Sequence, residues 1–374
     1  MAAVHSIVPA DSLIVSRPPP RKKSGILGWL RANLFADWKN ALATVLLLAG
    51  LLYLLPGFIG WAWLNAVFTP DNAACRALQG SGACWGAIAE KYRVILFGRY
   101  PFDQQWRPLT ATVLMVLMLI ASCTRPLWSK WLVLAWAIVL AAFFSLMGGG
   151  VAGLPKVATS YWGGLPLTIM LATFGIAAAF PLAILIALGR QSRLPAIRSL
   201  CAVYVELVRG VPLISVLFMA SFMFPLFMPR GFSVDVLMRV LAGITLFAAA
   251  YLAEVVRAGL QAVPRGQLEA AAAIGLDYWR TQRKVVLPQA LRLVVPSIMN
   301  SFISTFKDSS LVVIVSLYEL TGALTLALAG DAEWRQFYLE GYLFIAAIYW
   351  IFCYSMSRYS RWIEQHLNRG NRRA

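Results

Sequence analysis

Polar and charged side chains fall close together inside a long apolar stretch, residues 290–317. Asn300, Ser304 and Lys307 follow one another at intervals of four and three residues, and Asp308 comes next. On a helix the first three share one face, and ionisable groups inside a membrane span are usually functional. We predict that these four residues bind a zwitterionic solute, with Lys307 facing its carboxylate. The alternative is a structural ion pair of Lys307 with Asp308 or with a neighbouring helix.

A second pattern, in residues 263–288, predicts a short helix with a defined beginning and end. Pro264 suits a first helical turn, and Glu269 lies in the N-terminal half, where the helix dipole favours a carboxylate. The run Ala270–Ala273 favours a helix, and Gly275 supplies a left-handed stop. A helix covered by methyl groups can lie deep in a groove of another protein. The alternative is a loop helix that merely returns the chain to the membrane.

The composition places these patterns in a membrane protein. Hydrophobic residues make up 60% of the chain and charged residues 13%, well below the roughly 25% usual for soluble domains. A net charge of +17 could indicate nucleic acid, but the basic residues lie between apolar runs, so we expect no such partner. A helical span needs about 20 apolar residues. We therefore predict an all-α polytopic protein of about eight spans, at residues 41–63, 108–124, 131–148, 165–189, 200–228, 236–257, 290–317 and 341–360.

The basic residues also predict how the chain is oriented. With the N-terminus inside, the inside connections hold 22 Lys and Arg residues and the outside connections nine. Inside connections carry this excess in membrane proteins, so we predict that both termini are cytoplasmic. Near the predicted inner ends of two spans, Glu206 with Arg209 and Glu254 with Arg257 are interpreted as local ion pairs, with a gate contact as the alternative.

The chain divides by composition into four parts. We predict a basic tail with an interfacial amphipathic helix, a module of three spans, a unit that contains all the motifs, and a second basic tail, at residues 1–40, 41–150, 160–360 and 361–374. The module has an outside loop, residues 65–107. Cys75 and Cys84 in this loop can pair in an oxidising compartment or remain free thiols. Cysteine and histidine spacings typical of metal sites are missing, so we expect no metal site.

Several spaced motifs carry a resemblance to a known family. Glu269-Ala-Ala271 with Gly275 and Leu287-Pro288-Gln-Ala290 resembles the EAA signature of ABC-importer permeases. The match extends over residues 160–360 and is similar to the polar amino-acid branch; its further motifs are Gly164–Thr168, Tyr204–Pro212, Leu287–Arg292 and Lys307–Leu311 with Pro296 and Asn300. Val211 and Ile274 depart from it, since threonine and leucine are usual there. The added spans and loop resemble the M-type membrane subunit of general L-amino-acid importers.

This resemblance implies a type I five-helix core and a transport subunit that is not itself an enzyme. Its ATPase-coupling segment would be 264–288, with Glu269, Ala270, Ala271, Gly275, Leu287 and Pro288 as the coupling residues. The chain has no GxxxxGK[ST] phosphate-binding loop, so ATP and magnesium would lie on a separate ATPase dimer, and this chain would bind no cofactor.

The other implied partners are a second, related permease and a periplasmic amino-acid-binding protein, in a bacterial inner membrane. The alternative function is an ion-coupled secondary transporter, which would work without an ATPase. Such carriers often contain inverted repeats. We find no convincing repeat between residues 41–150 and 165–360. A secondary transporter also does not explain the alanine-rich helix.

Overall fold

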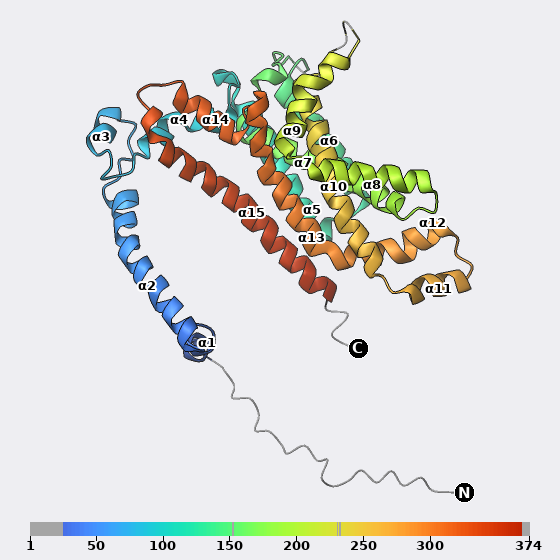
Figure 1. Ribbon diagram of the computed structural model, residues 1–374. Helices are drawn as coiled ribbons and strands as arrows, with labels where there is room; N and C mark the ends of the chain where they lie inside the picture. The colour runs from blue at the N-terminus through green and yellow to red at the C-terminus, as the bar shows by residue number, and fades with distance from the viewer. Residues whose placement is uncertain (1–24, 152, 230, 232, 369–374) are drawn as a thin grey trace, which may run out of the picture. The chain divides into compact units, whose positions relative to one another are not determined.

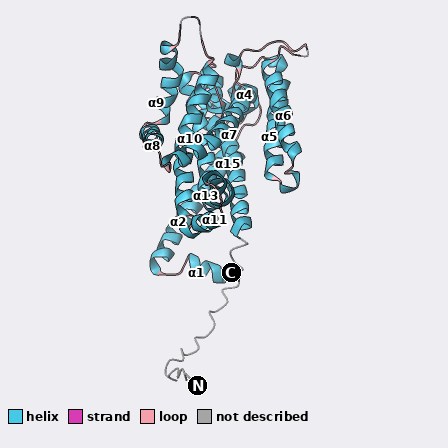
Figure 2. Ribbon diagram, turned by 90° about the vertical axis from the view of Figure 1, so that its right-hand side faces the viewer, coloured by secondary structure: helices cyan, strands magenta, loops and turns pink. Residues whose placement is uncertain are grey.

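The computed structural model describes residues 25–151, 153–229, 231 and 233–368. Within these residues every regular element is a helix, and β-pairing is limited to two isolated bridges (Figure 2). The all-α prediction is therefore confirmed. Most of the N-terminal basic tail and the last residues of the C-terminal tail lie outside the described residues. The chain forms two compact units, one of residues 1–66 with 80–83 and one of residues 67–79 with 84–374.

The described part of the first unit holds a short helix and a long apolar one. Helix α1, Ile26–Asn33, covers the segment predicted to be amphipathic, and α2, Trp38–Ile59, continues through a π-turn to Leu64. Asp37 caps α2, because its carboxylate accepts a hydrogen bond of 3.0 Å from the Asn40 amide. Together, Trp38–Leu64 is long and apolar enough to span a membrane. The position of α1 at a membrane surface stays a prediction.

The second unit contains six further unbroken helices of spanning length. They include α5, Trp106–Cys123; α6, Lys130–Gly148; α7, Gly164–Arg190; α10, Val236–Ala262; α13, Leu287–Asp308; and α15, Tyr338–Asn368. With the span of the first unit, the described residues hold seven such helices, or eight if one bent pair counts as a span. The predicted number of about eight spans is therefore confirmed.

The bent pair occupies the fifth predicted span. Helix α8, Pro195–Gly210, and helix α9, Leu213–Phe218, with the turns that follow it, meet at an angle of 105°. The break lies at Val211, whose backbone is extended, with φ −109° and ψ 135°. Proline disfavours a helical conformation in the preceding residue, so Pro212 explains the break. Residues 200–228 are thus not one straight helix.

Helix packing joins the predicted N-terminal module to the later helices. Helices α5 and α6 form a hairpin (Figure 2), and α5 also packs against α7. Helix α4, Gly86–Phe97, packs along α14, Leu320–Ala329. The compact units therefore do not divide at residues 150–160, and the functional division predicted there stays a prediction.

A buried arginine fixes the end of α6 at the glycine-rich segment Gly148–Gly150. Arg107 is 1% exposed, and its guanidinium donates to the backbone oxygens of Leu146 at 2.7 Å and Pro155 at 3.0 Å. Gly149, at φ +67°, leaves room for this guanidinium. The carbonyl end of a helix favours a cation. Arg107 therefore stabilises the C-terminus of α6 and holds the glycine-rich segment that follows it against α5.

Candidate functional site

The predicted short helix is present as α11, Arg265–Ala273, outside the spanning helices. At its end the Gly275 amide donates to Ala272 at 3.0 Å, and the Leu276 amide donates to Ala271 at 3.1 Å. These two bonds form a Schellman motif, which needs a left-handed residue. Gly275 supplies it with φ +76°. The helix and its glycine stop thus follow directly from the local sequence.

Helix α11 folds back on the segment that follows it, forming a helical hairpin. This segment consists of α12, Tyr278–Thr281, and a π-turn, Gln282–Val286, that leads into α13. Ala271 is buried on the inner side of the hairpin, whereas Glu269 and Ala270 are exposed. Figure 1 shows α11 and α12 side by side, at the opposite end of the bundle from α4 and α14. The residues predicted for coupling therefore occupy a projecting tip.

Large apolar side chains are exposed on this tip. Ile274 is 76% exposed and Trp279 is 66% exposed, and Leu268 and Tyr278 are exposed beside them. Exposed apolar side chains that gather at one place are typical of a protein-interaction surface. Sequence reasoning missed Ile274, Tyr278 and Trp279 as members of this surface. Two adjacent aromatic residues just after the glycine stop were the available signal.

The other two predicted coupling residues lie at the base of the hairpin. Leu287 is half-buried against a cluster formed by Ala187, Val256, Leu260, Val263, Val286 and Ala290. Pro288 is exposed at the second position of α13. Leu287 thus anchors the hairpin to α7 and α10, whereas Glu269, Ala270 and Gly275 are accessible to a partner.

The residues predicted to bind solute form a stripe along α13. Asn300, Ser304 and Lys307 are exposed in this chain, and Asp308 is half-buried. Among the described residues, no ion pair joins Lys307 to a carboxylate, so the structural ion pair considered as the alternative is not formed. Polar groups of a membrane helix rarely face lipid. The stripe therefore indicates a face of α13 that lines an aqueous path or meets another chain.

A network of charges joins α7, α8 and α10 toward the end of the bundle that carries α11. Arg190 binds Glu254 at 2.6 Å and Glu206 at 3.2 Å, and Arg257 also binds Glu254. Arg209 lies 3.8 Å from Glu254. The predicted local pair of Glu254 with Arg257 is formed. Glu206 instead pairs with Arg190, because α8 packs against α7, the helix that precedes it.

A buried carboxylate that sequence reasoning missed joins α7, α14 and α15. Glu319 is fully buried, and its carboxylate accepts hydrogen bonds from the Thr168 hydroxyl at 3.1 Å and the Tyr349 hydroxyl at 2.8 Å. It also caps α14 by accepting from the Thr321 and Gly322 amides. An acidic residue immediately before an apolar helix was the available signal.

The Gly163-Gly164 pair at the start of α7 allows three backbone segments to meet near Glu319. Gly164 has φ +64° and donates its amide to the Tyr318 carbonyl at 2.8 Å. A Cβ on Gly164 would lie 2.1 Å from the Leu96 carbonyl oxygen. The glycine of the Gly164–Thr168 motif is therefore required by a close backbone approach at the end of α4.

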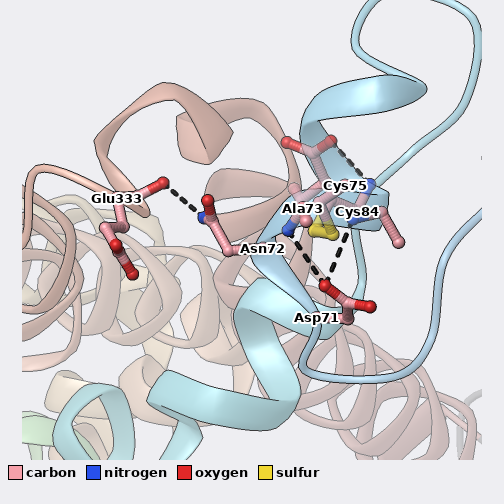
Figure 3. Close-up of a disulfide and its surroundings, with 8 residues drawn as sticks. Asp71, Asn72, Ala73, Cys75, Cys84 and Glu333 are labelled. Atoms are coloured by element: carbon pink, nitrogen blue, oxygen red, sulfur yellow. Dashed lines mark hydrogen bonds between the residues drawn. A yellow bond between two sulfur atoms is a disulfide. The ribbon is translucent and has the colours of Figure 1, made fainter.

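The outside loop is closed by a disulfide between Cys75 and Cys84, nine residues apart (Figure 3). Closing so short a loop stabilises it by about 2–3 kcal/mol. The Cys84 amide donates to the Glu340 carboxylate at 3.0 Å, and the Asn72 amide group donates to the Glu333 carbonyl at 2.6 Å. These bonds fix the loop to the start of α15 and to the segment before it.

A salt bridge adds a further contact between α4 and the segment before α15. The Lys91 ammonium lies 2.8 Å from the Asp331 carboxylate. This hydrogen bond holds the pKa of Asp331 below its usual value. An ion pair from α4 therefore adds to the hydrogen bond from Asn72 in binding this region to the connection between α14 and α15.

Comparison with known proteins gives consistent matches over the described bundle. The family model "Binding-protein-dependent transport system inner membrane component" matches residues 179–369. The inner membrane amino-acid ABC transporter permease protein YhdY of Escherichia coli is 45% identical, over 95% of this chain and 96% of its own length. The glutamate/glutamine/aspartate/asparagine transport system permease protein BztC of Rhodobacter capsulatus is 35% identical, over 96% and 98%. A solved structure described as an amino acid ABC transporter with histidines is 28% identical, with a TM-score of 0.48, over 54% and 92%.

Proposed function

The chain belongs to the family of binding-protein-dependent transport system inner membrane components, and we propose that it forms half of an amino-acid translocation pathway. As a permease of an ABC importer it is an integral, multi-pass membrane protein. The family favours this function over that of an ion-coupled secondary transporter. The names of two near-full-length relatives support amino acids as the substrate class.

The observation that carries this proposal is the polar stripe of Asn300, Ser304 and Lys307 on α13. The stripe is exposed although it belongs to a spanning helix. A second, related permease facing it would enclose an aqueous path between two such helices. The Lys307 ammonium would bind the carboxylate of the amino acid there, and Asp308 or a group of the partner would accept from its ammonium group. The five-helix type I core would consist of α7, the α8–α9 pair, α10, α13 and α15.

The projecting hairpin supports coupling to a separate ATPase. The exposed Glu269, Ala270 and Gly275, with the apolar side chains around them, would insert into a groove of an ATPase subunit. ATP and magnesium would bind to that ATPase dimer. Closure of the dimer would switch the two permease halves between inward and outward access as rigid bodies.

The opposite end of the bundle offers a surface for a soluble amino-acid-binding protein. Asn72, next to the disulfide-closed loop, and Lys91 of α4 both bind the segment before α15 there. A rigid surface of this kind suits repeated docking of a partner. With the hairpin in the cytoplasm, this surface faces the periplasm of a bacterial inner membrane.

The first experiment is purification of this chain from its native membrane in detergent. We expect an ATPase subunit and a second permease to purify with it, and uptake of amino acids to stop when the ATPase is inactivated. Mass spectrometry of the purified complex identifies the subunits. Uptake driven by an ion gradient, with no ATPase bound, would contradict the proposal.

Replacing Lys307 with methionine is expected to weaken substrate affinity. Methionine keeps much of the side-chain volume but removes the cation, and hydrogen bonds to charged groups contribute about 1.5–3 kcal/mol. The transport KM should therefore rise roughly 10- to 100-fold. The matched control is Lys130→Met at the start of α6, which should leave the KM unchanged. An unchanged KM for Lys307→Met would remove Lys307 from the substrate site.

A further inference from the structure

Two glutamine side chains join the projecting hairpin directly to the helix that carries the polar stripe. The Gln289 side-chain nitrogen, on α13, donates to the Gln267 side-chain oxygen, on α11, at 3.1 Å. The same nitrogen donates to the Val285 carbonyl at 2.9 Å, one turn earlier in its own segment. The second bond holds the Gln289 amide in place for the first. Within residues 233–368, this is the only side-chain hydrogen bond between α11 and α13.

The covalent connection between the two helices is a less direct link. It runs from Gly275, through α12, to the π-turn Gln282–Val286. A π-turn departs from regular α-helical bonding and is frequent at functional sites. Along the chain, a displacement of α11 must therefore pass through this irregular segment before it reaches α13. The hydrogen bond between Gln267 and Gln289 bypasses this segment.

The base of α13 is packed too closely to move by itself. A Cβ on Gly259 of α10 would lie 2.6 Å from the Ala290 carbonyl oxygen and 3.0 Å from the Val294 side chain. Ala290 is fully buried. Close-packed interiors transmit displacement rather than absorb it. A pull on Gln289 therefore moves α13 and α10 together.

Gln289 also lies in register with the polar stripe. It precedes Asn300 by 11 residues, which is close to three turns of a helix, so the two side chains share a face roughly 16 Å apart. Ser304 and Lys307 continue along that face. A shift imposed at Gln289 is thus applied to the face that would line the substrate path.

We propose that Gln289, through its hydrogen bond to Gln267, is a positioning residue that transmits motion of the docking hairpin to α13. This inference rests on the proposed ABC-importer function. When the bond is removed on the α13 side, at Gln289, the ATPase would still dock on α11, because the exposed residues of α11 are unchanged. The movement of α11 would be transmitted to α13 less completely. Less amino acid would then be transported for each ATP hydrolysed.

The test uses the complete complex with its ATPase in proteoliposomes and measures amino acid transported per ATP hydrolysed. Gln289→Leu and Gln267→Leu each remove the bond at similar side-chain size. We expect the ratio to fall about fivefold in both, as the loss of one modest hydrogen bond implies, with the ATPase still bound. Gln261→Leu, an exposed glutamine at the end of α10, is the matched control and should keep the ratio.

The double variant Gln267→Glu with Gln289→Lys separates transmission from structural support. The introduced lysine can donate both to the Val285 carbonyl and to the introduced carboxylate, so the link is rebuilt with different chemistry. The ratio should then return to within about twofold of the original, because a charged hydrogen bond replaces a neutral one. An unchanged ratio in both leucine variants, loss of ATPase binding in them, or failure of the double variant to restore transport would each overturn the inference. Failure of the proposed function looks different, because the unaltered complex would then show no ATP-dependent transport.

Discussion

Replacing Glu319 with leucine is expected to cause a large loss of stability in the helix bundle. Its carboxylate accepts hydrogen bonds from two hydroxyl groups and two backbone amides, and it is fully buried. Leucine would leave the two amides and the Tyr349 hydroxyl without this acceptor. The Thr168 hydroxyl keeps its other acceptor, the Gly164 carbonyl at 3.1 Å. Leaving one buried hydrogen-bond donor unsatisfied costs about 1–3 kcal/mol, and this variant leaves more than one.

The thermal unfolding of the detergent-solubilised protein measures this loss. Glu319→Gln should be intermediate, because its remaining oxygen can still accept from the amides that cap α14. Glu333→Leu is the matched control, since its side chain is exposed, and it should melt like the unaltered protein. Equal melting temperatures for Glu319→Leu and the unaltered protein would show that the network contributes nothing to stability.

The reason sequence reasoning missed Glu319 is the length of chain that separates its partners. Thr168 is 151 residues away and Tyr349 is 30 residues away, and no local pattern brings them together. Gly164 was noticed only as part of a motif. Its need for a left-handed conformation depends on Leu96, from a segment that the sequence assigned to a separate module.

The features that could be predicted depend on local physical chemistry. Whether an apolar run is long enough to span a bilayer depends only on the run itself. The positions of seven of the eight spans could therefore be predicted from composition. The helix α11 followed from a proline, an alanine run and a glycine within a dozen residues. Gly210 and Pro212 were visible as an interruption of the fifth span, but the bend of 105° depends on where α8 packs.

Ion pairs, too, could be predicted only where the local sequence decides the partner. Glu254 and Arg257, one helical turn apart, were correctly expected to pair. Glu206 was expected to pair with Arg209, which is also one turn away, but it binds Arg190 of α7. The packing of α8 against α7 decides between these partners. The sequence does not show how these two helices pack.

Replacing Gly275 with valine is expected to remove most of the transport activity. The left-handed conformation at φ +76° costs an ordinary residue about 1–2 kcal/mol and costs a β-branched residue more. Valine would therefore unwind the last turn of α11 and release the amide bonds to Ala271 and Ala272. The docking tip would lose its shape, and uptake into membrane vesicles should fall more than tenfold, which corresponds to roughly 1.4 kcal/mol.

Asparagine at the same position separates the backbone from the side chain. Asparagine tolerates the left-handed conformation better than most residues, and no atom lies within 4 Å of a Cβ built on Gly275. Gly275→Asn should therefore keep uptake within about threefold of the unaltered protein, as a cost of a few tenths of a kcal/mol implies. Equal and severe losses in both variants, with the ATPase no longer purifying with the chain, would mean that any side chain at this position obstructs docking. Because α11 projects from the bundle, neither variant should lower the melting temperature as Glu319→Leu does, so a loss of uptake would report on coupling rather than on folding.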